Sequence, residues 1–235
     1  MIHTLRRRLV AAWAPSPIDI TIPGGACSIS FDDVPHSVWE AGKPVLDHYQ
    51  AKATFYMVGR LVNQPGYLSA EELQTLHAEG HEIASHTWEH HRLGRMSPAA
   101  LKADLERNHI LFDEMLPEAP LKNFSYPCGS IAPWHKRLLA ERYTTCRTTI
   151  PGLIAGRVDA LSLPAFKLYH DTVDWTVVNV WLQEAKALHG WVIFYTHDVS
   201  ATPGSAGCTP EDLGRLLELA KHNDLPVKPI RDVLP

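Results

Sequence analysis

Short apolar segments and amphipathic segments alternate along most of the chain. The apolar segments have the length and the β-branched and aromatic content of buried strands, and they cover residues 26–31, 53–58, 82–84, 122–126, 143–149, 166–169 and 191–195. The amphipathic segments predict helices that begin near Ser37, Ser69, Ser97, Pro133, Asp174 and Thr209. Residues 226–229 predict a weak closing strand, and residues 151–164 give no clear prediction. This order predicts an α/β fold with about seven parallel strands, either a closed barrel or an open doubly wound sheet.

Length and composition indicate one globular domain over residues 1–235, with 45% hydrophobic and 20% charged residues. The formal net charge of −4 argues against a nucleic-acid binder, because binding to phosphates needs clustered Lys and Arg. The 4 cysteines form no Cys-x-x-Cys pair, so we expect them to be reduced. Nothing in the composition indicates an oligomeric state.

The N-terminal segment decides the expected location. Arg6, Arg7 and Arg8 precede a short apolar run, which Pro15 ends well before the length of a signal-peptide core. No stretch approaches the roughly 20 apolar residues of a membrane span. We therefore expect a cytoplasmic protein without a transmembrane segment. The alternative is that its basic N-terminal segment contacts a membrane surface.

Polar residues that can carry chemistry follow four of the predicted strands. They are Asp32 and Asp33, His86 and His90, Tyr126 to Cys128, and His197. In a parallel α/β sheet or barrel, the carboxyl ends of the strands meet at one edge, where active residues gather. The sequence therefore predicts that these side chains share one site.

The two histidines His86 and His90 have a spacing of four residues, which places both on one side of a turn or short helix. His77 and His81 have the same spacing but belong to a segment with a helical pattern that stops at Gly80. Because only the first pair follows a strand, we expect His86 and His90 to bind a metal and His77 and His81 not to bind one.

Asp33, His86 and His90 make a set of two histidines and one carboxylate that leaves coordination positions open. Non-haem iron oxygenases use the same ligand set, so the ligands alone do not fix the metal. Asp32 could take a proton from water, and His197 could give one to a leaving amine. A base, an acid and a Lewis acid together favour hydrolysis over oxidation.

Four motifs in the chain resemble those of polysaccharide deacetylases with the NodB homology domain, which form carbohydrate esterase family 4. They are Ser30–Asp33, His86–His90, Phe124–Gly129 and Tyr195–Asp198. The resemblance implies a distorted (β/α) barrel with seven strands and the metal-dependent release of acetate from N-acetylated sugars. The sugar could belong to a polysaccharide, a lipid-linked saccharide or a nucleotide sugar.

The resemblance also implies roles for individual residues. By it, Asp32 is the general base, His197 is the general acid, and Asp33, His86 and His90 bind one divalent metal. Zinc is favoured for this metal, with cobalt, nickel and manganese as alternatives.

The sequence departs from the family pattern at three positions. Val34 replaces the usual Gly after the two aspartates, and Ser125 stands where many members have an Arg that pairs with the base. Arg60 and Arg92 are the candidates to replace that Arg. Tyr195 stands where a Leu usually lines the acetyl pocket.

The resemblance also suggests roles for Asp174 and Trp175. Asp174 either orients His197 or caps the helix that follows it, and Trp175 either walls the pocket or belongs to the first turn of that helix. We expect four side chains to contact the substrate, namely Tyr126, Pro127, Tyr195 and Trp175.

Cys128 has three conceivable roles beside a metal: thiolate ligand, nucleophile, or donor of a backbone N–H to a developing oxyanion. A fourth protein ligand would close the metal site, and water already supplies a nucleophile, so we favour the backbone amide. The turn at Pro127 and Gly129 allows the close approach that this requires. The family uses the amide at this position in the same way.

Two alternatives to N-deacetylation remain. A related metal-dependent hydrolase of O-acetyl esters or cyclic amides could use the same groups. A carbohydrate-binding relative without activity would have no need to keep both Asp32 and His197.

Overall fold

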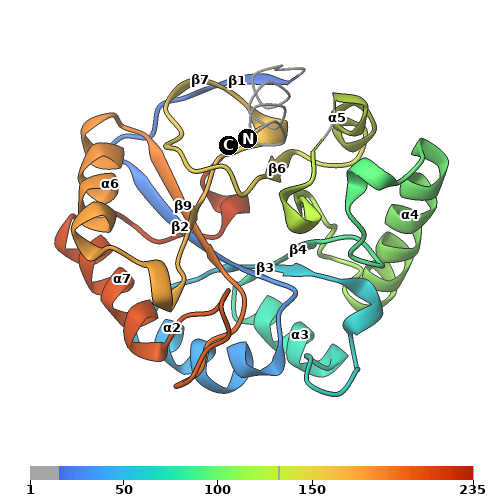
Figure 1. Ribbon diagram of the computed structural model, residues 1–235, viewed down its shortest axis with the longest axis horizontal. Coiled ribbons are helices and arrows are strands. Elements are labelled where there is room, and N and C mark those ends of the chain that lie inside the picture. Colours follow the sequence, from blue (N-terminus) through green and yellow to red (C-terminus); the bar gives the residue numbers. More distant parts are fainter. Residues whose placement is uncertain (1–15, 132, 235) are drawn as a thin grey trace.

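The computed structural model describes residues 16–131 and 133–234, and its centre is a parallel sheet of seven strands in the order β6-β5-β4-β3-β2-β9-β8. The strands are β2 (Ala26–Asp32), β3 (Thr54–Met57), β4 (Glu82–Ser85), β5 (Asn123–Ser125), β6 (Thr145–Arg147), β8 (Phe166–Lys167) and β9 (Trp191–Thr196). The sheet curls into an incomplete barrel (Figure 1), which confirms the expected distorted (β/α) barrel with seven strands.

Backbone hydrogen bonds partly bridge the opening between β6 and β8. The N–H of Leu163 donates to the carbonyl of Cys146 at 2.9 Å, and the N–H of Ala165 donates to the carbonyl of Ile150 at 2.9 Å. Because these residues directly precede β8, the chain passes close to β6 before it enters the sheet.

In the described part of the chain, six α-helices cover the outer face of the sheet (Figure 1). They are α2 (Lys43–His48), α3 (Ala70–Ala78), α4 (Pro98–Met115), α5 (Pro133–Ala140), α6 (Trp175–Ala187) and α7 (Pro210–His222). The side chains of Ser69, Ser97 and Thr209 cap the starts of α3, α4 and α7, as the sequence predicts. The helix expected near Ser37 begins instead as a π-helical turn, Val38–Gly42, without a side-chain cap.

The strand alternation sorts the side chains into two environments. Outward residues such as Phe31, Phe55 and Phe194 pack in the main hydrophobic core under the helices. The inward face is more polar. At the carboxyl ends of the strands it carries Asp32 and Arg147, among other residues, and both are almost fully buried.

Two regions differ from the sequence-based prediction. Strands β1 (Pro17–Ile20) and β7 (Gly156–Asp159) form a separate antiparallel pair, which the pattern of residues 151–164 did not predict. The closing strand expected at 226–229 is reduced to one bridge between Val227 and Cys27.

The chain then forms a short 3-10 helix, η7 (Ile230–Asp232), whose backbone donates to side chains at the amino ends of β3 and β4. The basic segment that could contact a membrane surface lies outside the described residues. None of the described helices combines the length and hydrophobicity needed to cross a bilayer.

Candidate metal and hydrolytic site

The two aspartates at the end of β2 point in different directions because the chain turns sharply between them. Asp33 and Val34 have φ of 59° and 51°, and the N–H of Val34 donates to the carbonyl of Asp32 at 2.6 Å. A β-branched residue is strained in this left-handed region, at about 1–3 kcal/mol, and Val34 is fully buried in the core. The Gly that the resemblance expects here would adopt this φ without strain.

The segment that carries His86 and His90 follows β4 and is a bent loop, so of the turn or short helix expected from the spacing, the short helix is wrong. Thr87 and His90 have φ of 70° and 57°, and the Thr87 hydroxyl accepts from the N–H of His90 at 3.0 Å. The Asp104 carboxylate of α4 accepts from two backbone N–H groups of this loop, at 2.7 and 3.0 Å. The buried carboxylate therefore fixes the shape of the loop.

This loop brings Asp33, His86 and His90 together. Asp33 Oδ1 lies 3.7 Å from Nε2 of His86 and 3.3 Å from Nε2 of His90, and this oxygen is buried without a hydrogen-bond partner in the described structure. Nδ1 of His86 lies 2.8 Å from the carbonyl oxygen of Ser125, which can only accept, so Nδ1 carries the proton. Nε2 then directs its lone pair toward Asp33, as in metal-binding histidines.

Burial lowers the pKa of His86 to about 4, so its imidazole is neutral at ordinary pH, the form that binds metals. Two converging imidazoles and one carboxylate oxygen without a partner fit a divalent metal ion.

The sequence-based prediction missed Arg147, the residue whose side chain pairs with Asp32. Its buried guanidinium donates to Asp32 Oδ1 and, at 2.6 Å, to the hydroxyl of Ser125, which is its register partner in the sheet. The candidates Arg60 and Arg92 are wrong: both are exposed, and Arg60 lies 3.5 Å from Glu89. The cation beside Asp32 thus comes from β6, one strand farther than Ser125 of β5.

Arg147 also sets the charge of Asp32. Burial alone would raise the pKa of Asp32, but the guanidinium of Arg147, with smaller contributions from His86 and His197, holds it below the ordinary value of 3.8. The carboxylate is therefore ionised at neutral pH. The rings of Tyr195 and Tyr56 lie 4.7 and 5.2 Å from the guanidinium carbon, so aromatic faces fix its orientation.

His197 follows β9, beside Asp32 on the neighbouring strand β2. Its Nδ1 is buried without a hydrogen-bond partner among the described residues. Asp174 instead caps α6, where its Oδ1 accepts from the N–H of Thr176 at 2.9 Å and of Val177 at 3.3 Å. The predicted interaction of Asp174 with His197 is therefore not observed, because the helix N-terminus uses the carboxylate.

Trp175 lies in the first turn of α6 and faces α7. The guanidinium carbon of Arg215 lies 4.6 Å from the centre of its ring, and the indole packs against the main hydrophobic core. The described contacts do not join Trp175 to Asp33, His86 or His90, so its predicted role as a pocket wall gains no support.

The turn after β5 places Cys128 at the surface. Cys128 and Gly129 have φ of 52° and 56°, and Cys128 is exposed whereas Pro127 is buried. The Tyr126 ring points outward into the helix layer, and its hydroxyl donates to the carbonyl of Leu161 at 2.9 Å. The predicted contact of Tyr126 with substrate is therefore wrong, because the strand alternation turns Ser125 inward and Tyr126 outward.

A second group of potential ligands consists of Asp47, Glu79 and His81. The Lys43 ammonium already lies 2.6 Å from Asp47 and 2.8 Å from Glu79. Nδ1 of His81 accepts from the N–H of Ala53 at 3.2 Å, so its buried Nε2 carries the proton and has no lone pair for a metal. The ammonium of Lys43 therefore occupies the place that a metal ion would take in this group.

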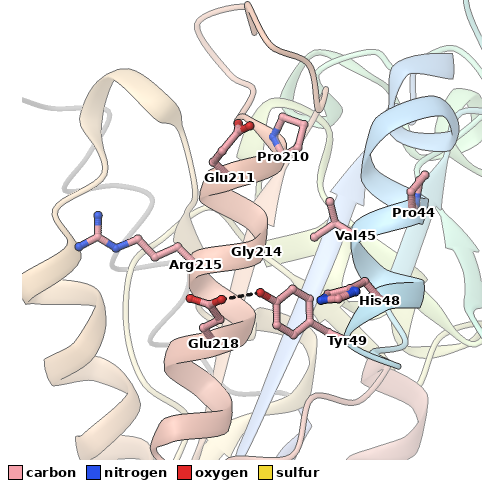
Figure 2. Close-up of a pocket in the computed structure, with 9 residues that line it drawn as sticks. All are labelled: Pro44, Val45, His48, Tyr49, Pro210, Glu211, Gly214, Arg215 and Glu218. Carbon is pink, nitrogen blue, oxygen red and sulfur yellow. Dashed lines mark hydrogen bonds between the residues drawn. The ribbon is translucent and has the colours of Figure 1, made fainter.

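A surface groove of about 560 Å³ lies between α2 and α7 (Figure 2). In it, the Tyr49 hydroxyl donates to Glu218 at 2.7 Å. Its lining contains none of the residues predicted to act in catalysis: Pro44, Val45, His48, Tyr49, Pro210, Glu211, Gly214, Arg215 and Glu218.

Residues 20–143, just over half of the chain, match the family model described as polysaccharide deacetylase. The chain belongs to this polysaccharide deacetylase family. A peptidoglycan-N-acetylglucosamine deacetylase of Bacillus cereus is 35% identical over 107 residues, which are 44% of this chain and 46% of that relative. The chain spans about a third to a half of the length of the curated deacetylases that it matches.

Solved structures of the same family share the fold. The CE4 domain of a xylanase from the hindgut metagenome of Trinervitermes trinervoides has a TM-score of 0.60 at 17% identity, with 89% of each chain covered. A mutant of a CE4 pseudoenzyme, described as having restored enzymatic activity, has a TM-score of 0.64 at 16% identity. The match covers 95% of this chain and 72% of the chain of that mutant.

Proposed function

We propose that this member of the polysaccharide deacetylase family is a metal-dependent hydrolase that releases acetate from N-acetylated sugars. One observation carries the proposal: the buried carboxylate of Asp32, held ionised by Arg147, lies at the same rim as the converging Asp33, His86 and His90. A site that only bound carbohydrate would gain nothing from a buried ionised base beside such a group.

Asp33, His86 and His90 would hold the metal, with zinc favoured. When bound, a divalent cation polarises the acyl carbonyl and lowers the pKa of a nearby water. Asp32 accepts the proton of the attacking water as the new C–O bond forms. His197 donates a proton to the amide nitrogen as the C–N bond breaks, so that acetate and a free amine leave.

The amide of Cys128 is proposed to donate to the oxygen that becomes negative in the tetrahedral intermediate. The left-handed backbone at Cys128 and Gly129 supports this role, because it forms a sharp turn directly after β5, with Cys128 exposed and Pro127 buried. Such a donor contributes about 3 kcal/mol to the transition state in other enzymes. The thiol of Cys128 has no part in the proposed reaction.

Arg147 is proposed as the positioning residue of the base. It fixes the carboxylate of Asp32 through a direct hydrogen bond, and the Ser125 hydroxyl and two tyrosine rings fix Arg147 in turn. The small side chain of Ser125 leaves room for the guanidinium that arrives from β6.

Two alternatives are kept. Hydrolysis of O-acetyl esters or cyclic amides needs the same base, acid and metal. The second alternative is an inactive carbohydrate-binding relative, since one of the similar structures is that of a CE4 pseudoenzyme mutant. The ionised Asp32 argues against this alternative.

Acetate release after reconstitution with zinc or cobalt tests the proposal directly. The panel contains N-acetylglucosamine, its β-1,4-linked oligomers, O-acetylated xylan and 4-nitrophenyl acetate, each with and without a chelator. We expect release from an N-acetylated sugar that the chelator abolishes and zinc restores. Release from esters alone would favour the esterase, and no release from any substrate would favour the inactive relative.

A further inference from the structure

The loop between His86 and His90 is held from outside by two neighbouring elements. On one side, Oδ1 of Asp104 in α4 accepts from the N–H of Trp88 at 2.7 Å, and its Oδ2 accepts from the N–H of Glu89 at 3.0 Å. Hydrogen bonds to a carboxylate are strong, and Asp104 is only 6% exposed, so little water competes for it. This side chain thus holds two consecutive N–H groups of the loop.

On the other side, the short 3-10 helix η2 (Gly59–Leu61) holds two carbonyl groups of the same loop. The N–H of Gly59 donates to the carbonyl of Thr87 at 3.1 Å, and the N–H of Arg60 donates to the carbonyl of Trp88 at 3.3 Å. A Cβ at residue 59 would lie 2.7 Å from the Trp88 ring, so only glycine allows this close approach. The loop therefore lies between α4 and η2, with contacts to both.

These contacts bind both ends of the same two peptide groups. In the peptide groups Thr87–Trp88 and Trp88–Glu89, the N–H donates to Asp104 and the carbonyl accepts from η2. Because a peptide group is planar, neither one can rotate without the loss of hydrogen bonds on both sides. The path of the chain from His86 to His90 is therefore set by α4 and η2.

The loop depends on this support because its own backbone conformation is unfavourable. Thr87 and His90 have φ of 70° and 57°, a region that residues other than glycine rarely adopt and that suits the β-branched Thr87 least. Such a conformation persists only where the surrounding structure imposes it. Without Asp104, we expect the loop to relax and the imidazole of His90 to move.

The two histidines depend on the loop to different degrees. His86 directly follows β4, and its Nδ1 donates to the carbonyl of Ser125 at 2.8 Å. His90 comes after the two held peptide groups, and its N–H donates to the Thr87 hydroxyl of the same loop at 3.0 Å. The place of its imidazole, with Nε2 3.3 Å from Asp33, therefore follows the path of the loop.

The exposed charges around the loop hold it less firmly. Glu89 lies 3.4 Å from Arg107 of α4 and 3.5 Å from Arg60, and these two Arg side chains are 58% and 47% exposed. Ion pairs in water contribute little. The buried Asp104, rather than Arg107, is therefore the α4 residue that determines the shape of the loop.

We propose that Asp104 is a positioning residue of the metal site, which acts through the loop on His90 and so sets the affinity for the divalent metal. This rests on the metal site of the function proposed above. Residues that orient metal ligands contribute about 10- to 100-fold to metal affinity in other proteins, and the same range is expected here.

The test compares zinc dissociation constants of wild type, Asp104→Asn, Asp104→Ala and the control Asp212→Asn, measured by competition with a chromogenic chelator. Asp212 is a similarly buried carboxylate, 8% exposed, that accepts from the N–H of Thr209 at 3.1 Å. It belongs to α7, on the opposite side of the barrel from α4 (Figure 1). We expect both Asp104 variants to bind zinc about 10- to 100-fold more weakly, and Asp212→Asn to stay within about twofold of wild type.

Asp104→Asn is the sharper of the two variants because it keeps the size of the side chain. Its amide has one acceptor oxygen and turns a donor toward the second N–H, so one of the two hydrogen bonds is lost. The visible absorption of bound cobalt, which reports the coordination geometry, should change in Asp104→Asn and not in Asp212→Asn. Unfolding by urea of the metal-free proteins gives the stability of each variant separately.

A folded Asp104→Asn with the zinc dissociation constant and cobalt spectrum of the wild type would overturn the positioning role and leave the proposed hydrolase intact. An equal weakening in Asp212→Asn would also overturn it, because the effect would then follow general stability. A wild type that bound no zinc would overturn the metal site and the positioning role together. Zinc binding that Asp104→Asn weakens, without acetate release by the wild type, would overturn the hydrolase alone.

Discussion

The two ends of the barrel both contain buried polar side chains, but the inward-facing ones at the two ends differ in how they are satisfied. At the amino ends of the strands, Glu82 accepts from Thr54 at 2.8 Å and from Asn123 at 2.5 Å, and the Asn123 oxygen accepts from Thr145 at 2.6 Å. The backbone N–H of Arg231 donates to the same Glu82 carboxylate at 2.9 Å. Each of these side-chain oxygens thus has a partner, and η7 covers this end.

The carboxyl ends of the strands show the opposite. The buried atoms there that have no partner in the described structure include Asp33 Oδ1, His197 Nδ1, Arg147 Nε and the Tyr56 hydroxyl. An unpaired buried polar group costs about 1–3 kcal/mol, a cost that a bound ligand or water can remove. Strain adds to this at Val34, with its positive φ.

The difference separates stability from function within one sheet. The paired end belongs to the core, and the proposed function assigns metal binding and proton transfer to the unpaired end. The following predictions test this division.

Asp32→Asn should have the largest effect. Loss of a general base lowers rates by roughly 100- to 10,000-fold, while the metal ligands are unchanged. Steady-state kinetics on the best substrate of the panel, with metal content measured on the same samples, checks this. Near-normal turnover in a metal-loaded Asp32→Asn protein would remove Asp32 from the mechanism.

Arg147→Met should alter both stability and pH dependence. In the wild type, the lowered pKa keeps Asp32 ionised and its ion pair intact above about pH 4, and both are lost as the pH falls through that lowered value. Without Arg147, burial remains the largest influence and raises the pKa of Asp32. The acid limb of kcat/KM should therefore move to higher pH, and unfolding by urea should show a loss of about 3–5 kcal/mol.

Two further variants sharpen this prediction. The double variant Ser125→Arg/Arg147→Ser should return the acid limb toward that of the wild type, because it supplies the cation from β5. Arg60→Met, at the exposed position that the sequence suggested, should change neither the pH profile of kcat/KM nor the free energy of unfolding. An acid limb that stays in place in Arg147→Met would show that Arg147 does not control the base.

Glu82→Gln tests the paired end and should act on stability alone. Burial raises the pKa of Glu82, while its hydrogen bonds oppose that rise, and the amide replaces one acceptor with a donor. We expect a loss of about 1 kcal/mol in the free energy of unfolding and a kcat/KM within about twofold of wild type. A tenfold loss of kcat/KM with an unchanged fold would contradict the division between the ends.

The raised pKa of Glu82 also makes the free energy of unfolding depend on pH. The ionised carboxylate disfavours folding. The free energy of unfolding therefore falls as the pH rises from the pKa of Glu82 in the unfolded chain through its raised pKa in the folded protein. The Gln variant should lack this component of the stability profile.

Cys128→Ser should have the smallest effect, because the proposed mechanism uses only the backbone amide of this residue. Metal content and most of the activity should be retained, and circular dichroism should be unchanged. Loss of the metal or of turnover would show that the thiol takes part directly.

The strand-helix alternation and the residues at the strand ends were readable from the sequence because burial and period-2 alternation depend on local composition. The pairing of β1 with β7 was not, because these exposed edge strands lack an apolar run. Arg147 was missed although residues 143–149 were predicted as a strand. The signal was its place two residues after Thr145, on the inward face that also carries the active residues.

Other errors came from reading spacing without backbone geometry. His86 and His90 meet because Thr87 and His90 adopt positive φ, which a four-residue spacing does not reveal. Tyr126 follows a correctly predicted strand, but the register that turns its ring outward comes from the pairing of Ser125 with Arg147.

Metal content of single variants tests the central claim most directly. Purified wild type, His90→Ala and His81→Ala are dialysed against equal zinc and analysed by plasma emission spectroscopy, with circular dichroism to confirm folding. The account predicts about one zinc ion per chain in the wild type and in His81→Ala, and little or none in His90→Ala. Full occupancy in His90→Ala, or loss of zinc in a folded His81→Ala, would contradict the assignment of the metal to the unpaired end of the barrel.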